Sequence, residues 1–174
     1  MTIFDVILLV LVGGFVLFGL WFGFIHTLGS LIGTIFGTFF AGWLHAPIAA
    51  FLSTFIGDTN KVYFFTYVIL FILISRVFGF LFFLLDSVMK IFTRLPFLKQ
   101  VDKLLGMLVG LVEGVLVVSL ALILTQKYNL GLSFQSALES SKVGIWLMTT
   151  GTILVPLLPK SFDDLRAIKT NIGL

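Results

Sequence analysis

A long stretch without formal charge near the start of the chain constrains the fold more than any other feature. No Asp, Glu, Lys or Arg occurs from Val6 to Gly57. A helix needs about 20 mostly apolar residues to cross the ~30 Å hydrocarbon core of a bilayer, so this stretch is long enough for two crossings. The surface of a soluble domain would carry charges over such a length. The sequence therefore predicts an integral membrane protein.

Composition supports the same class. Of the 174 residues, 59% are hydrophobic and 11% are charged, whereas soluble domains are about 25% charged. The absence of cysteine excludes disulfides, thiolate metal sites and a cysteine nucleophile. No basic residue precedes the first apolar stretch, which is longer than the apolar part of a signal peptide. We therefore expect this stretch to be retained as the first span, with Asp5 capping it near an interface.

Hydropathy predicts an all-α, polytopic membrane fold with four transmembrane helices and additional interfacial helices. The approximate limits of the four spans are residues 4–24, 28–44, 62–85 and 104–125. The first two spans are expected to form an antiparallel hairpin, because a single bent helix would far exceed the bilayer. Residues 46–61 are predicted to be an external connection, with a turn at Gly57-Asp58-Thr59-Asn60.

Two further segments are predicted to lie in or near the membrane interface. In residues 86–103 the apolar side chains share one helical side, while Lys90 and Arg94 point elsewhere. This pattern is typical of an interfacial helix, which we expect to end at Pro96. Residues 143–158 are short and polar for a full crossing, so an interfacial or re-entrant helix is the favoured interpretation. Residues 160–174 form a polar tail.

The distribution of basic residues predicts the orientation of the chain. Lys90, Arg94, Lys99 and Lys103 lie between the third and fourth spans, whereas Lys61 alone lies between the second and third. Positive residues favour the cytoplasmic side, so the Lys90–Lys103 connection is predicted to be cytoplasmic. Four spans would then place both termini outside. A fifth crossing at 143–158 would place the basic tail inside, which the same rule also accepts.

Glycine recurs at every fourth position in two of the predicted spans. The two sets are Gly29, Gly33 and Gly37 in the second span and Gly106, Gly110 and Gly114 in the fourth. Residues four apart share one face of a helix, and small residues let membrane helices approach closely. The favoured interpretation is helix packing within one chain. The alternative is the seam of a pore or of an oligomer.

Two charged residues are predicted to lie inside the spans. Arg76 and Glu113 each lie nine residues from the assumed inner end of their span, which is about 13–14 Å at 1.5 Å per residue. Equal depth predicts an ion pair, which would lower the cost of holding either charge in lipid. The alternative hypothesis is a titratable site in a proton or ion path.

Motifs of the common enzyme classes are absent from the sequence. His26 and His45 are too far apart for a short metal-ligand motif, and no phosphate-binding loop ends in Lys-Ser or Lys-Thr. The basic residues lie beside lipid-facing segments, which argues against nucleic-acid binding. We therefore predict no enzyme, with no catalytic, cofactor-binding or metal-binding residues and no cofactor. The expected partners are the lipid bilayer and either further copies of the chain or another membrane protein.

Two segments resemble the colicin V production protein family (CvpA family), which comprises small bacterial inner-membrane proteins. The first segment is residues 23–31 and the second is residues 101–117, and the similarity extends over about residues 4–158. The residues that match the family pattern are Gly23, Phe24, Asp102, Lys103 and Gly106. Two positions depart from the pattern: His26 replaces the basic residues usual near the first turn, and Glu113 stands where the family often has Arg.

The resemblance implies a location in the inner membrane and a role in toxin (colicin V) production and in envelope homeostasis. It implies no molecular mechanism. The leading hypothesis is a membrane protein that acts through helix interactions rather than catalysis. The alternative is a small oligomeric transporter or channel, which would require a water-filled path through the membrane.

Overall fold

The computed structural model describes residues 2–89, 96–128, 137–138 and 140–151, and their regular structure is entirely helical. The helices are α1 (Ile3–Phe22), α2 (Phe24–Ile56), α3 (Thr59–Met89), α4 (Pro96–Lys127) and α6 (Lys142–Gly151). Helices α1 to α4 each contain a segment long and apolar enough to cross a membrane. The predicted all-α, polytopic membrane fold with four transmembrane helices is therefore confirmed.

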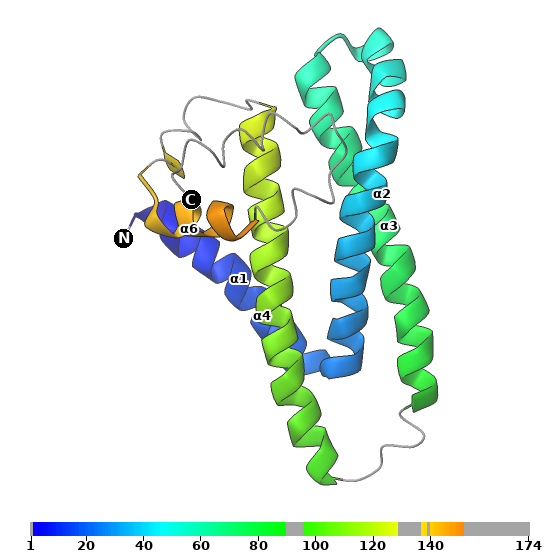
Figure 1. Ribbon diagram of the computed structural model, residues 1–174, viewed down its shortest axis with the longest axis vertical. Helices are drawn as coiled ribbons and strands as arrows, with labels where there is room; N and C mark the ends of the chain where they lie inside the picture. The colour runs from blue at the N-terminus through cyan, green and yellow to red at the C-terminus, as the bar shows by residue number, and fades with distance from the viewer. Residues whose placement is uncertain (1, 90–95, 129–136, 139, 152–174) are drawn as a thin grey trace.

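The four long helices are arranged as two antiparallel pairs (Figure 1). Helix α1 packs along α4, and α2 packs along α3, while α4 also contacts α2. The α1–α2 turn lies in the lower part of Figure 1, together with the C-terminal end of α3 and the N-terminal end of α4. This end of the molecule is here called the Gly23 end. The α2–α3 turn lies at the opposite end, here called the Gly57 end.

A cap and a glycine set the limits of α1. Thr2 and Asp5 form a capping box, in which each side chain accepts a hydrogen bond from the backbone of the other residue. The helix ends at Gly23, whose φ of 87° favours glycine and whose N–H donates to the Gly19 carbonyl at 2.9 Å. Because α2 begins at the next residue, the two helices reverse direction around a single glycine.

The two glycine sets lie at contacts between helices of the same chain. A Cβ atom on Gly29, Gly33 or Gly37 would overlap atoms of α3, for example the Ser75 carbonyl oxygen, which would lie 2.8 Å from a Cβ on Gly33. Cβ atoms on Gly106, Gly110 and Gly114 would overlap atoms of α1 in the same way. The glycines therefore set the close approach within each helix pair.

The segment predicted to connect the second and third spans, residues 46–61, is mostly helical, and its place outside the membrane remains a prediction. Helix α2 continues through Pro47 to Ile56, and only Gly57 and Asp58 separate it from α3. The segment after Pro47 is rich in alanine and apolar residues, and Ala49 is fully buried, so packing outweighs the backbone donor lost at the proline. With 33 residues, α2 is about 50 Å long and exceeds the thickness of the bilayer.

The predicted interfacial helix ending at Pro96 is wrong. Pro96 is the first residue of α4, and α3 extends to Met89. Proline is favoured at the first position of a helix, where its missing N–H would have no partner. Residues 90–95 lie outside the described residues. Within 143–158, α6 covers residues up to Gly151, whereas 152–158 and the tail at 160–174 are not described, so their relation to the membrane remains a prediction.

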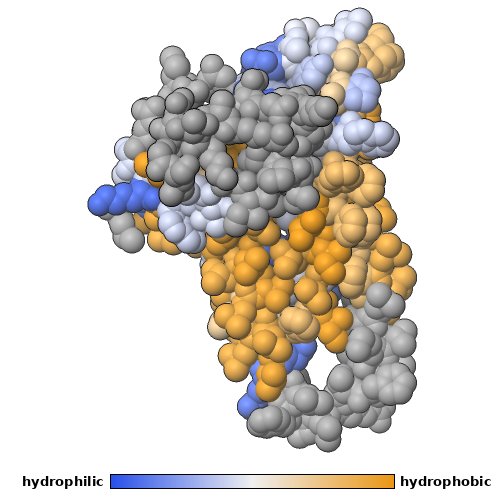
Figure 2. Space-filling model, viewed as in Figure 1, coloured by the Kyte–Doolittle hydropathy of each residue, from blue (hydrophilic) through white to orange (hydrophobic). Residues whose placement is uncertain are grey.

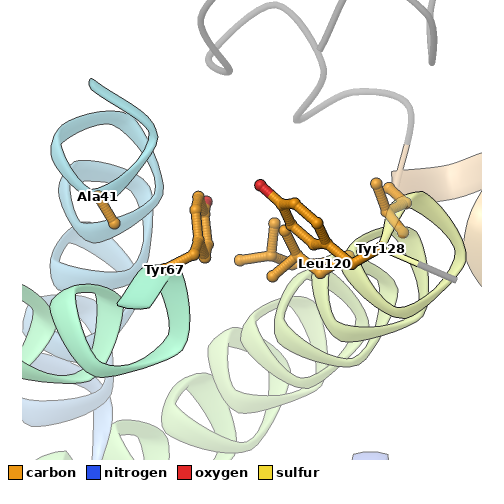
Figure 3. Packing of buried hydrophobic residues seen from close by; sticks show 6 residues of the cluster. Ala41, Tyr67, Leu120 and Tyr128 are labelled. Carbon is orange, nitrogen blue, oxygen red and sulfur yellow. The ribbon is translucent and has the colours of Figure 1, made fainter. Parts of the chain in front are cut away.

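Two apolar clusters form the core at the Gly57 end. One joins α2, α3 and α4 and contains Ala41, Tyr67, Leu120, Ile123, Leu124 and Tyr128 (Figure 3). The other joins α1, α4 and the region around α6 and contains Leu8, Val12, Val118, Leu122, Leu138 and Leu147. Outside these clusters, hydrophobic side chains cover the middle of the visible surface of the helices (Figure 2), as expected for a surface that faces lipid.

Candidate functional site

A cavity of about 730 Å³ lies among the four long helices, within their membrane-spanning segments. Helix α1 contributes an apolar wall of Leu11, Gly14, Phe15 and Phe18. The polar and charged lining residues are His26, Ser30 and Thr34 from α2, Ser75 and Arg76 from α3, and Glu113 from α4. Small-molecule sites are typically cavities of about 300–1,000 Å³ with a few convergent polar groups on apolar walls, and this cavity has that character.

Glu113 is the most deeply buried charged residue of the cavity. Its exposed fraction is 3%. Its Oε1 atom accepts a hydrogen bond from Ser30 Oγ at 2.5 Å and a longer one from Thr34 Oγ1 at 3.4 Å. Ser30 and Thr34 are four residues apart on α2, so both hydroxyls face α4. The carboxyl group is therefore held by neutral donors.

Arg76 lines the same cavity, but it does not form the predicted ion pair with Glu113. As expected from their equal depth, the two residues line one cavity. However, α4 packs most closely against α1 and α2, and α3 packs most closely against α2, so Glu113 bonds to hydroxyl groups of α2 instead. Among the residues that the structure describes, an ion pair is instead found between Lys61 Nζ and Asp58 Oδ2, at 2.7 Å. The hydrogen bond from Lys61 lowers the pKa of Asp58.

Two buried oxygen atoms at the cavity lack a hydrogen-bond partner among the described residues. They are Glu113 Oε2 and Ser75 Oγ. A buried polar atom without a partner is unfavourable, by about 1–3 kcal/mol for a neutral group and more for a charged one. A polar guest in the cavity would remove this cost.

The sequence prediction missed this cavity, although the spacing of His26, Ser30 and Thr34, four residues apart on one helix face, was a signal for it.

The cluster of Ala41, Tyr67, Leu120, Ile123, Leu124 and Tyr128, here called the aromatic cluster, lies between the cavity and the Gly57 end. Along α2, α3 and α4, its residues follow those that line the cavity. The Tyr67 hydroxyl donates to the Thr38 carbonyl at 3.2 Å, and the Tyr128 hydroxyl lies 3.1 Å from His45 Nε2. Burial raises the pKa of the Tyr128 phenol to about 12, so this contact keeps its proton near neutral pH.

The two segments that resemble the family pattern meet at the Gly23 end. The Phe24 N–H donates to Asp102 Oδ1 at 3.1 Å, so the carboxylate caps the start of α2, where a negative charge is favoured. A Cβ on Gly23 would overlap the same carboxylate, and a Cβ on Gly106 would lie 2.6 Å from the Gly23 carbonyl carbon. Lys103 is exposed beside them. Four of the five family-pattern residues therefore form one junction between α1, α2 and α4.

Asp5 has a second role that the sequence did not indicate. Its exposed fraction is 2%, and its Oδ1 atom accepts hydrogen bonds from Ser141 Oγ at 2.5 Å and from the Val143 N–H at 3.1 Å. One carboxylate thus caps both α1 and α6. Ser119 Oγ also donates to the Leu147 carbonyl at 2.7 Å. These contacts fix α6 against α1 and α4.

Four bilayer-length helices that line a cavity with a few polar and charged residues define a multi-pass helical membrane protein. Within the described ranges, no three His, Asp or Glu side chains come together as a metal site. The family model described as colicin V production protein matches residues 4–151, so the chain belongs to the colicin V production protein family. No curated protein and no solved structure gives a significant match to the chain.

Proposed function

We propose that the chain is a non-enzymatic protein of a bacterial inner membrane that binds a small polar solute or ion in the cavity and carries it across the bilayer. The observation that carries this proposal is the cavity that is lined by Arg76 and Glu113 without a direct ion pair. Ionisable residues inside a membrane bundle mark substrate or ion paths. The family description points to toxin production as the setting, and we extend it to maintenance of the envelope.

The arrangement of the helices supports a movement that would open the cavity. Each helix pair is closely packed through glycines, whereas the boundary between the pairs contains the cavity. Membrane transporters commonly move one rigid helix bundle against another around a central site. In the same way, movement of α1 and α4 against α2 and α3 would separate the aromatic cluster and open the Gly57 end.

The proposed orientation places the Gly23 end in the cytoplasm. Lys99 and Lys103 lie on the first turns of α4 at this end, and Lys90 and Arg94 precede them in the sequence. At the α2–α3 turn the single basic residue is Lys61, which is paired with Asp58. The positive-inside rule favours this orientation.

Water access to the cavity tests the proposal, and the absence of cysteine makes the test clean. Gly14 and Gly13 are neighbours on α1, and both have room for a side chain, but only Gly14 lines the cavity. A charged, water-soluble thiol reagent applied to membrane vesicles should therefore modify Gly14→Cys and leave Gly13→Cys unmodified. Modification of neither variant, in vesicles of either orientation, would contradict a water-filled cavity.

Interaction with another protein or a second copy is a second candidate function, supported by the length of the α2–α3 hairpin. Beyond Pro47, α2 exposes Phe51, Phe55 and Ile56, with Phe55 74% exposed. Large apolar side chains on a segment beyond the bilayer mark an interaction surface. If this candidate is correct, Phe51→Ser combined with Phe55→Ser should lower the apparent mass of the detergent-solubilised protein on native gels. An unchanged mass would argue against it.

A further inference from the structure

The hydrogen bonds of Glu113 are unusual for a carboxylate buried in a membrane bundle. Both groups that donate to it are neutral hydroxyls, and Oε2 has no partner among the described residues. An ionised carboxylate held without a neighbouring positive charge is costly in an apolar medium, and a bound proton removes that cost. A protonated Oε2 would also become a donor that faces the cavity.

The charged and titratable groups around Glu113 can be named helix by helix. Helix α1 contributes no such group to the cavity wall, α2 contributes His26, and α3 contributes Arg76. On α4 the nearest other charge, Lys103, is ten residues away, about 15 Å along the axis, and α6 has only the exposed Lys142 at its start. Arg76 makes no ion pair with Glu113, so no salt bridge holds the Glu113 carboxyl group in its ionised form.

A line of polar side chains connects Glu113 to the Gly23 end. His26 lies in the first turn of α2, and its ring stacks on Phe22 with centroids 4.8 Å apart. Ser30 follows one turn later and already donates to Glu113. Histidine gains and loses a proton near neutral pH, and both residues line the cavity. Toward the Gly57 end, by contrast, the residues that follow along α2, α3 and α4 belong to the aromatic cluster.

We infer that Glu113 is a reversible proton-binding site, loaded from the Gly23 end past His26, and that proton binding there accompanies transport of the solute. This inference rests on the proposed function, because it assigns the coupling ion to the same cavity. In the loading step, a proton from bulk water binds the imidazole and then passes, directly or through cavity water, to Glu113 Oε2, where an O–H bond forms. In release the O–H bond breaks, the proton passes to cavity water and the carboxylate is restored, so no oxidant, reductant or metal takes part.

Infrared spectroscopy of the full-length protein in lipid vesicles tests the site directly. As the pH falls, the wild-type protein should gain a carbonyl band of a protonated carboxylic acid, and Glu113→Gln should lack that band. Asp58→Asn is the matched control, because Asp58 is a carboxylate outside the cavity, and it should retain the band of Glu113. His26→Gln should slow proton uptake by at least about tenfold while leaving the final extent unchanged.

A second measurement needs no variant and therefore does not depend on the folding of Glu113→Gln. Dicyclohexylcarbodiimide reacts with protonated carboxyl groups in apolar surroundings, so it should modify Glu113 faster at lower pH, as measured by peptide mass spectrometry. A Glu113 carbonyl band that does not change with pH, or no modification of Glu113 at any pH, would overturn the inference. If Glu113 titrates while Gly14→Cys remains inaccessible to water, the proposed transport fails and the proton site stands.

Discussion

At the scale of single residues, a few polar atoms join helices that otherwise meet through apolar or glycine surfaces. Asp102 caps α2, Asp5 caps α6, and Glu113 bonds to two hydroxyls of α2. Each carboxylate thus connects its own helix to another one. In the apolar interior of a membrane, no water competes for the hydrogen bonds of such polar groups. These three residues therefore specify how the helices are placed.

Gly23→Ala should destabilise the protein. The φ of 87° disfavours alanine, and the new Cβ would overlap the Asp102 carboxylate. We expect a loss of about 1–3 kcal/mol, the typical cost of a strained backbone conformation, measured as a lower midpoint of thermal unfolding in detergent. The matched control is Gly13→Ala, where the Cβ meets no atom within 4 Å. It should be neutral or stabilise the helix by about 0.5–1 kcal/mol, and equal midpoints for the two variants would contradict this prediction.

The hydrogen bond between Ser30 and Glu113 predicts energetic coupling that Arg76 should not share. In a double-mutant cycle, Ser30→Ala and Glu113→Leu should deviate from additivity by about 0.5–3 kcal/mol, as is usual for residues in contact. Arg76→Leu and Glu113→Leu should show a smaller deviation, because no ion pair joins them. Folded yield and thermal stability in one detergent provide the measurement. A larger coupling for the pair with Arg76 would show that the two charges meet in the membrane.

At the scale of helices, the sequence was most informative where a short periodic pattern corresponds to a contact. The recurrence of glycine at every fourth position predicted helix faces that approach a neighbour closely. The structure places both sets of glycines against a neighbouring helix. The ends of helices were harder to predict. Pro47 lies inside α2, although it falls in the predicted connection over 46–61, and Pro96 begins α4, although it was expected to end a helix. The effect of a proline depends on packing elsewhere in the chain.

The cavity was only partly predictable, for a related reason. The depths of Arg76 and Glu113 follow from counting residues along a helix, and the structure does bring both to one cavity. Which helices pack against each other does not follow from counting. Because α4 packs more closely against α2 than against α3, the Glu113 carboxyl group bonds to Ser30 and Thr34. The double role of Asp5 depends in the same way on a contact with residues more than a hundred positions later.

Gly110→Leu should separate α1 from α4. A Cβ at this position would overlap the carbonyl group of Phe15, which is backbone and cannot rotate away. We expect a loss of about 1–3 kcal/mol through overpacking, seen as a lower thermal midpoint, and a smaller loss for Gly110→Ala in the same direction. Unchanged midpoints for both variants would indicate that this face does not contact α1.

Ser141→Ala should loosen α6. Its hydroxyl donates to Asp5 and accepts from the Gly144 N–H at 2.8 Å, and a hydrogen bond to a charged group contributes about 1.5–3 kcal/mol. Hydrogen exchange of the α6 amides should become faster, while that of α2 and α3 stays the same. The neighbouring Ser140 makes only a local bond to the Ala137 carbonyl, so Ser140→Ala is the control. Equal exchange in both variants would contradict the tether.

At the scale of the whole molecule, the two glycine-packed pairs place the chain's polar features at defined depths. The Gly23 end holds the Asp102 junction and the basic start of α4. The Gly57 end holds the aromatic cluster, the long α2–α3 hairpin and α6. The cavity lies between these ends. The two ends therefore differ in the charged and aromatic side chains that they hold.

The orientation predicts opposite labelling at the two ends. An impermeant thiol reagent applied to intact cells without their outer membrane should modify Asp58→Cys, which lies in the α2–α3 turn. It should modify Lys103→Cys, which is exposed at the Gly23 end, only after the membrane is permeabilised. The reverse pattern would place the Gly23 end outside the cell and would reverse the direction from which Glu113 is loaded.

The packing of α1 has a consequence for the assembly of the chain during its synthesis. Helix α1 makes few contacts with α2 and finds its main partner in α4, which emerges from the ribosome after two further membrane helices. Until then, the face of α1 that contains Phe15 and Gly19 has no partner from its own chain among the long helices and must be shielded by lipid or by the insertion machinery. The insertion of α4 therefore completes the contacts of α1, brings Glu113 to Ser30 and forms the cavity in a single late step of biogenesis.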